Sequence, residues 1–263
     1  MKKSKFGCFI TARTSSTRLP RKVLLPIRGK AVIEHLIDRV RLIKNTDFIV
    51  LCTSTKPEDD ILETVARKHG IKFFRGSLKD VIARWVGAAD EYKVDYFVEV
   101  DGDDIFTDPE LIDSAIVQMR QRPCDLLKGP SNLIAGLFCA CLSVEALRKI
   151  IKLKNTDDTG YWDFYFTENS LFDIRELLVE NQAFFNPNIR LTLDYQEDLD
   201  LFRKVFDEFD TDINNVPSRQ IVDLLNKKPE LAQINLFRQR QYLNNREKNK
   251  SKVLLRDNKT FSE

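Results

Sequence analysis

Histidine, methionine and tryptophan are scarce in this chain of 263 residues, which contains two of each. The two histidines, His35 and His69, fall in predicted helices away from the motifs described below. A catalytic histidine is therefore disfavoured, despite the aptitude of imidazole for proton transfer near neutral pH. The net charge is also small, at +2, so the molecule as a whole is not expected to attract nucleic acid.

Long apolar runs are absent as well. No stretch approaches the ~18 apolar residues that a membrane-spanning helix needs, and residues 6–10 are too short for the core of a signal peptide. The five cysteines are odd in number, and neither a second cysteine pair nor a nearby histidine completes a zinc site with Cys139 and Cys141. We expect buried free thiols and a cytoplasmic protein with no membrane partner.

No linker rich in glycine, proline or serine divides the chain. We expect one domain over residues 1–230, followed by a C-terminal helix and polar tail over 231–263, of which the last ~18 residues form a frayed helix or tail. In the first half the patterns alternate between strands at 6–10, 47–52, 71–74 and 96–100 and helices at 31–43, 57–69, 78–92 and 109–120. Asp108 is expected to cap the last of these helices. The alternation predicts an α/β fold with a mostly parallel sheet covered by helices.

The regular alternation of strands and helices ends after residue 122. Strand-like segments lie at 125–128, 133–142 and 184–193, with helices at 144–153 and from about Gln196. We expect this half to extend the sheet with antiparallel strands and to shape the pocket of a second substrate.

A loop rich in hydroxyls and cations follows the first predicted strand. Its hydroxyl and backbone N–H groups can donate to phosphate oxygens, while Arg13, Arg18 and Lys22 can neutralise phosphate charge. The loop lacks the Gly-x-x-x-x-Gly-Lys pattern, so a basic surface loop remains the alternative. Residues 1–44 carry twelve lysines and arginines against two acidic residues, which suits an anionic small ligand as well as RNA.

Carboxylates gather after the predicted strand 96–100, at Asp101, Asp103 and Asp104. The carboxyl ends of parallel strands are where open α/β sheets bind ligands, and Gly102 allows a sharp turn and a close approach. Crowded carboxylates favour a cation such as Mg²⁺, although a solvated acidic turn is the alternative. Asp194 ends a second strand-like segment, where it could either cap the next helix or face a metal.

Together these segments resemble the cytidylyltransferases that make CMP-activated acidic sugars, which include the 3-deoxy-manno-octulosonate and acylneuraminate enzymes. The likeness is greatest to the spore-coat-polysaccharide branch, whose Ala-Arg-x-x-Ser-Thr-Arg-Leu-Pro-Gly-Lys-x-Leu motif is matched by residues 12–24. It continues in order through residues 29–30, 59–60, 74–81, 102–103, 108–110, 193–194 and 197–199. Two departures stand out: Arg21 replaces the usual glycine before Lys22, and Asp104 replaces a frequent proline.

The resemblance implies a Rossmann-like nucleotide-diphosphosugar transferase fold, with a mixed, mostly parallel central sheet flanked by helices. It implies catalytic roles for Arg13, Lys22 and Asp103, and a Mg²⁺ ion held by Asp103 and Asp194. The residues expected to bind substrate are Ala12, Arg13, Ser16, Thr17, Arg18, Lys22, Arg75, Ser77 and Gly102.

The implied reaction is attack by a sugar hydroxyl on the α-phosphorus of CTP, with release of pyrophosphate. The acceptor is expected to be an acidic sugar, such as a 3-deoxy-ulosonate or nonulosonate, with a phosphonate as an alternative. A glycosyltransferase of related fold is a second reading, because Asp101 and Asp103 have Asp-x-Asp spacing. A non-enzymatic RNA-binding module is a third, but the basic segments lack the interleaved aromatic residues typical of such modules.

Relatives of this fold are commonly homodimers, so a homodimer is expected here. The segment 126–142 is rich in apolar residues, which form either sheet core or the surface against which a partner packs: Leu133, Ile134, Leu137, Phe138 and Leu142.

Overall fold

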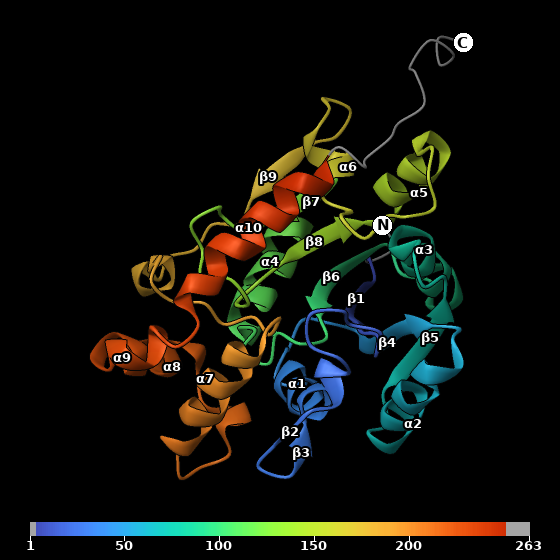
Figure 1. The fold of residues 1–263 in the computed structure, drawn as a ribbon. Helices are drawn as coiled ribbons and strands as arrows, with labels where there is room; N and C mark the ends of the chain where they lie inside the picture. The colour runs from blue at the N-terminus through green and yellow to red at the C-terminus, as the bar shows by residue number, and fades with distance from the viewer. Residues whose placement is uncertain (1–3, 251–263) are drawn as a thin grey trace.

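The computed structural model describes residues 4–250 and is built around a seven-stranded sheet (Figure 1). The strands lie in the order β5-β4-β1-β6-β8-β7-β9. Neighbours among the first four are parallel, β8 is antiparallel to β6 and β7, and β9 is parallel to β7. The bounds are β1 Phe6–Thr11, β4 Phe48–Ser54, β5 Lys72–Gly76, β6 Tyr96–Asp101, β7 Leu126–Lys128, β8 Ala140–Ser143 and β9 Ile174–Glu176.

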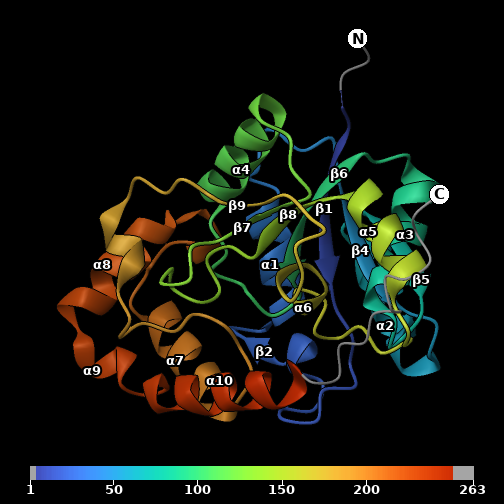
Figure 2. The same ribbon diagram turned by 90° about the horizontal axis from the view of Figure 1, so that it is seen from above.

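Helices cover both faces of the sheet, because successive side chains of a strand point to opposite faces. In β1, Cys8 and Ile10 join one apolar cluster and Phe9 joins the other. The first cluster includes α1 Val32–Val40, α2 Asp60–Lys68, α4 Pro109–Gln121, α7 Gln196–Asp207 and α8 Ser218–Lys227. The second includes α3 Val81–Tyr92, α5 Val144–Leu153 and α6 Phe164–Thr167, and α3 and α5 lie side by side (Figures 1 and 2).

Short elements connect these layers. A hairpin precedes α1, and four 3₁₀ turns and two further helices complete the described chain: β2 Pro26–Ile27, β3 Lys30–Ala31, η1 Lys22–Leu24, η2 Pro57–Asp59, η3 Gln182–Phe185, η4 Ile213–Asn215, α9 Pro229–Ala232 and α10 Leu236–Lys250. The predicted α/β class with a mixed, mostly parallel sheet is confirmed. Asp108 caps α4 as predicted, since its Oδ1 accepts from the backbone N–H of Leu111 at 2.8 Å.

Two strand predictions for the second half are wrong: one strand is much shorter than predicted, and the other does not form. Only the last part of segment 133–142 enters β8, and segment 184–193 forms no strand. There Pro187 has no N–H to give to a ladder, and Asn186 forms a local turn by accepting from the N–H of Asn188 at 2.9 Å. The two segments are joined by one isolated parallel bridge, Ala135 to Arg190, and by a hydrogen bond from the Ile134 N–H to the Phe184 carbonyl oxygen at 2.9 Å.

Most apolar side chains of segment 126–142 belong to the core, and Leu133 is half-buried against it. Ile134, Leu137, Phe138 and Leu142 are all buried within the single chain. Their burial confirms the core reading and removes these side chains as a contact face for a partner. The homodimer itself stays a prediction.

Helix α10 packs on the domain through polar contacts. Arg238 makes a two-pronged ion pair with Glu197 of α7 at 3.0 and 2.7 Å, and Figure 2 shows α10 running past α7. Arg246 pairs with Asp163. Of the last ~18 residues, predicted as a frayed helix or tail, those up to Lys250 continue α10, and residues 251–263 lie outside the described residues.

Two further expectations concern membrane spans and cysteines. Within the described part of the chain, no helix has the length and apolar character needed to cross a bilayer. All five cysteines are free thiols; four are buried and Cys139 is half-buried.

Gly136 allows the contact between segments 133–142 and 184–193. Its φ of 93° lies in the left-handed region, and an added Cβ would come within 2.1 Å of the Leu191 carbonyl oxygen. We predict that Gly136→Ala lowers the free energy of unfolding by about 3 kcal/mol or more, measured by denaturant titration. Gly70→Ala is the matched control, because Gly70 also has positive φ (61°) but open space around it, and it should cost about 1–2 kcal/mol. Equal losses in the two variants would contradict the steric argument.

Candidate active site

The loop that follows β1 is pinned by one buried carboxylate. Both the backbone N–H and the hydroxyl of Thr14 donate to Asp59 Oδ1, each at 2.7 Å, and the Ser54 hydroxyl donates to the other oxygen. Asp59 is fully buried. The loop is thereby held against the end of β4. From the sequence, Asp59 appeared only as one matched residue of the family pattern, and nothing in its spacing revealed this role.

The ends of β1 and β6 meet at Ala12 and Gly102. A Cβ on Gly102 would lie 2.7 Å from the Cβ of Ala12 and 2.9 Å from the Thr11 carbonyl oxygen, so only glycine fits there. The chain runs from β1 to β4 on one side and returns to β6 on the other. This point of reversal is where open α/β sheets bind ligands.

Lys22 brings together the two carboxylates that the sequence singled out. Its ammonium contacts Asp103, Asp194 Oδ1 at 3.0 Å and the Leu193 carbonyl oxygen at 2.7 Å, which uses all three of its protons. Burial alone would lower the pKa of Lys22, but the two carboxylates outweigh burial and raise it. For Asp103, burial dominates and raises the carboxyl pKa despite Lys22.

Asp194 is surrounded by cations and does not cap α7. Arg18 and Lys22 contact one of its oxygens, and Arg190 donates to the other at 2.9 Å. These charges lower the pKa of Asp194 although burial opposes them. The start of α7 is capped instead by Asp198, which accepts from the N–H groups of residues 194 and 195 at 2.8 and 2.9 Å. The cap reading of Asp194 is therefore wrong.

A network of buried hydrogen bonds around Arg190 holds Asp194 in place. Arg190 is fully buried, and besides Asp194 it contacts Asp198 at 3.1 Å and Gln239 of α10 at 2.8 Å. Asn235 donates to both the Arg190 carbonyl oxygen and the Asp198 carboxylate. Sequence reasoning missed this network, because polar residues in a helical, charged C-terminal segment usually face solvent.

Two of the predicted phosphate-binding residues on the loop after β1 have hydrogen-bond donors that contact no other described residue. Arg13 and Thr17 are exposed and make no hydrogen bond or ion pair with the described residues, whereas the Ser16 hydroxyl accepts from the N–H of Leu19 at 3.4 Å. Arg21 is exposed and has a φ of 55°, the left-handed conformation in which glycine is favoured. This explains why the family pattern places glycine at position 21.

Arg75 and Ser77 are engaged elsewhere. The Arg75 guanidinium donates to the carbonyl oxygens of Ser54 and Lys56, each at 3.0 Å, and pairs with Asp60 at 2.6 Å. The Ser77 hydroxyl accepts from the backbone N–H of Asp80 at 3.0 Å. Neither contacts the cluster of Lys22, Asp103 and Asp194, so the structure gives both a local role in ordering the loops after β4 and β5.

The pair Asp103 and Asp194 fits a divalent cation. One oxygen of each carboxylate contacts the same Lys22 ammonium, so two hard oxygen ligands converge on a single positive charge. Mg²⁺ is typically held by one or two carboxylates, with phosphate oxygens and waters completing its shell. Asp101, which shares the Asp-x-Asp spacing, lies instead beside Glu99 and Cys139.

Comparisons with known proteins agree with this geometry. A sequence model of the cytidylyltransferase family matches residues 8–249. The chain is 30% identical over 230 residues to the spore coat polysaccharide biosynthesis protein SpsF of Bacillus subtilis, covering 85% of this chain and 95% of SpsF. A solved cytidylyltransferase from Leptospira borgpetersenii has a TM-score of 0.81 at 25% identity and covers 88% of this chain and 98% of its own.

A more distant structure shows the fold alone. A CMP:2-keto-3-deoxy-manno-octonic acid synthetase complexed with CTP has a TM-score of 0.59 at 17% identity, covering 78% of this chain and 99% of that one.

The family match spans the loop after β1, Asp103, Asp194 and most of α10. It favours neither the glycosyltransferase nor the RNA-binding alternative. The chain therefore belongs to the cytidylyltransferase family and is a nucleotidyltransferase.

Proposed function

We propose that this enzyme transfers a cytidylyl group from CTP to a hydroxyl of an acidic sugar and releases pyrophosphate. The observation that carries the proposal is the convergence of Asp103 and Asp194 on one cation, beside a loop with free arginine and hydroxyl donors. A structure of the same fold holding CTP, and a relative named for spore coat polysaccharide biosynthesis, support the choice of substrates.

Lys22 has two roles in this proposal. In the absence of nucleotide its ammonium neutralises Asp103 and Asp194. When CTP is bound, Asp103 and Asp194 would hold a divalent cation, and Lys22 would leave the two carboxylates to contact the phosphates. The exchange conserves charge balance, because each negative group still faces a positive one.

Asp103 and Asp194 would hold Mg²⁺. When bound, this ion supplies Lewis-acid polarisation of the α-phosphate and of the incoming hydroxyl. Arg190 holds Asp194 in place at 2.9 Å, so this ligand does not have to be ordered when the ion binds.

The reaction is an in-line displacement. The acceptor hydroxyl oxygen forms a bond to the α-phosphorus, the bond to the bridging oxygen breaks, and pyrophosphate leaves with the electron pair while the hydroxyl proton passes to solvent. Arg13 and Lys22 neutralise the charge that grows on the leaving group, and the rigid loop supplies positioning. We also propose a cytoplasmic homodimer, supported for its compartment by the five free thiols.

Asp103→Asn should abolish turnover while the fold persists, because Lys22 still pairs with Asp194. We expect at least a 100-fold loss of pyrophosphate release with CTP, Mg²⁺ and a panel of 3-deoxy-ulosonates, nonulosonates and phosphonates, roughly the effect of removing one electrostatic stabiliser. Asp207→Asn, a surface change beside Arg28, should leave the rate unchanged. Near-normal turnover of Asp103→Asn at saturating Mg²⁺ would refute the metal assignment, and wild-type release that depends on another nucleotide would refute CTP.

Lys22→Met separates the two roles of this lysine. Without a competing ammonium, the nucleotide-free variant should bind Mn²⁺ about 10-fold more tightly than wild type, measured by calorimetry. Its KM for CTP should rise, because a phosphate contact is lost. Lys228→Met, which removes a surface partner of Glu208, is the control and should change neither value. Unchanged Mn²⁺ affinity in Lys22→Met would show that this lysine does not occupy the cation position.

A further inference from the structure

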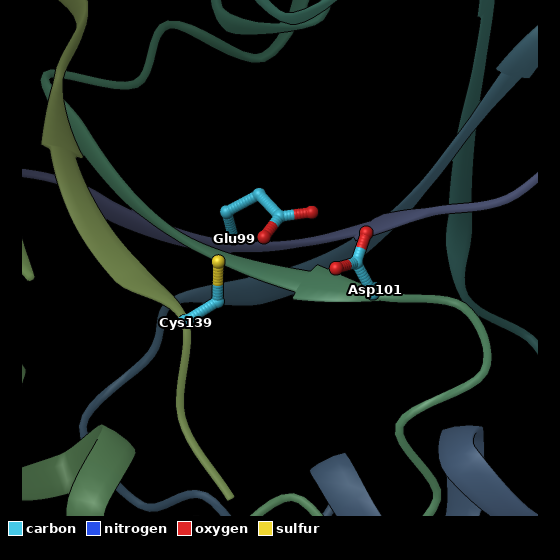
Figure 3. Close-up of side chains that lie close together, drawn as sticks. All are labelled: Glu99, Asp101 and Cys139. Atoms are coloured by element: carbon cyan, nitrogen blue, oxygen red, sulfur yellow. The ribbon is translucent and has the colours of Figure 1, made fainter. Parts of the chain in front are cut away.

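A second group of potential metal ligands lies on β6 and just before β8 (Figure 3). A carboxylate oxygen of Glu99, one of Asp101 and the Sγ of Cys139 all lie within 4.8 Å of one another. In Figure 3 the two carboxyl groups rise from the same side of β6, and the thiol of Cys139 points toward Glu99. Three ligand atoms from two neighbouring strands therefore face one small volume.

Glu99 is the least expected member of this group. It is 1% exposed, and the Cys139 thiol and the Thr11 hydroxyl are the polar side chains beside its carboxylate, which has no cationic partner among the described residues. Among residues 4–248, no lysine, arginine or histidine forms an ion pair with Glu99 or Asp101. A buried carboxylate without a cation beside it is costly, and a bound metal ion would supply the missing positive charge.

The buried arginine of α3 does not form an ion pair with this group. Arg84 of α3 is 2% exposed and donates to the Ser77 carbonyl oxygen at 2.8 Å, and it forms no ion pair with Glu99. Lys22 is likewise committed to Asp103 and Asp194. Glu99, Asp101 and Cys139 thus offer three potential metal ligands, and no lysine, arginine or histidine of the described residues pairs with the two carboxylates.

The sheet itself fixes this arrangement. Glu99 and Asp101 share a face of β6 because they are two residues apart, and the antiparallel register that pairs Glu99 with Ala140 brings Cys139 alongside. Asp101 is exposed while Glu99 is buried, so an ion could enter past Asp101 and settle against Glu99. An entry path and fixed ligands are both needed for a metal site.

We propose that Glu99, Asp101 and Cys139 bind a divalent transition-metal ion of the zinc class, separate from the Mg²⁺ proposed between Asp103 and Asp194. A thiolate selects a softer metal than Mg²⁺, and carboxylates are accepted zinc ligands. Three protein ligands leave at least one position open to water or substrate, as in catalytic rather than structural sites. The thiol proton leaves to solvent on binding, and the ion neutralises Glu99 and joins β6 to the start of β8.

Co²⁺ is the probe that tests this site, because a cobalt–thiolate bond produces a charge-transfer absorption in the near ultraviolet that carboxylate ligands alone do not. Titration of the full chain should produce this band and saturate at one Co²⁺ per chain, and Zn²⁺ should bleach it. Cys139→Ser should abolish the band. Cys124→Ser, which changes a buried thiol elsewhere, should retain it, as should Asp103→Asn.

Two further variants keep the test decisive if Cys139→Ser folds poorly. Asp101→Asn changes an exposed side chain and should keep the band but weaken Co²⁺ binding about 10-fold, and Glu99→Gln should weaken it at least as much. The proposal is overturned if saturating Co²⁺ gives no thiolate band, or if the band survives in Cys139→Ser. It is also overturned if both carboxylate variants bind Co²⁺ as wild type does. None of these readouts depends on cytidylyl transfer.

Discussion

The contact of the Lys22 ammonium with Asp103 and Asp194 is the interaction on which the site depends. It joins the loop after β1, the end of β6 and the segment before α7, which are far apart in the sequence. Two buried carboxylates that face each other repel unless a cation lies between them. In the structure Lys22 is that cation, and it keeps both carboxylates close together.

The surroundings of this contact are rigid. Asp59 holds the loop through Thr14, and Gly102 lets β1 and β6 end in contact with Ala12. Arg190, itself fully buried, fixes Asp194. Side chains held this way have little conformational freedom to lose, and such positioning is the main contribution a protein makes to phosphoryl-type transfer.

Much of this site could be predicted from the sequence, because its parts follow local patterns. The loop after β1 and the carboxylates at strand ends are recognisable from neighbouring residues alone, and parallel strands bring such ends together. The buried network around Arg190 could not be predicted in the same way, since it includes Asn235 and Gln239 from a distant segment. Arg75 shows the converse: a charged residue in the right motif is occupied by backbone carbonyls.

The fold shows the same division. The long alternating elements of the first half were predictable, whereas β9 has only three residues, too few for an alternating pattern to show. Segment 184–193 looked like a strand from its apolar content, but Pro187 and the turn at Asn186 override that content. Short elements that depend on partners elsewhere in the chain are the ones that a local pattern misses.

The central claim is that Lys22 gives up its place between two carboxylates to a divalent cation when nucleotide binds. Anomalous diffraction from crystals grown with Mn²⁺ and a non-hydrolysable CTP analogue tests it directly. We expect one Mn²⁺ peak bridging Asp103 and Asp194, with the Lys22 ammonium moved to the phosphates. A structure in which the nucleotide is bound while Lys22 still lies between the two carboxylates, with no Mn²⁺ there, would contradict the account.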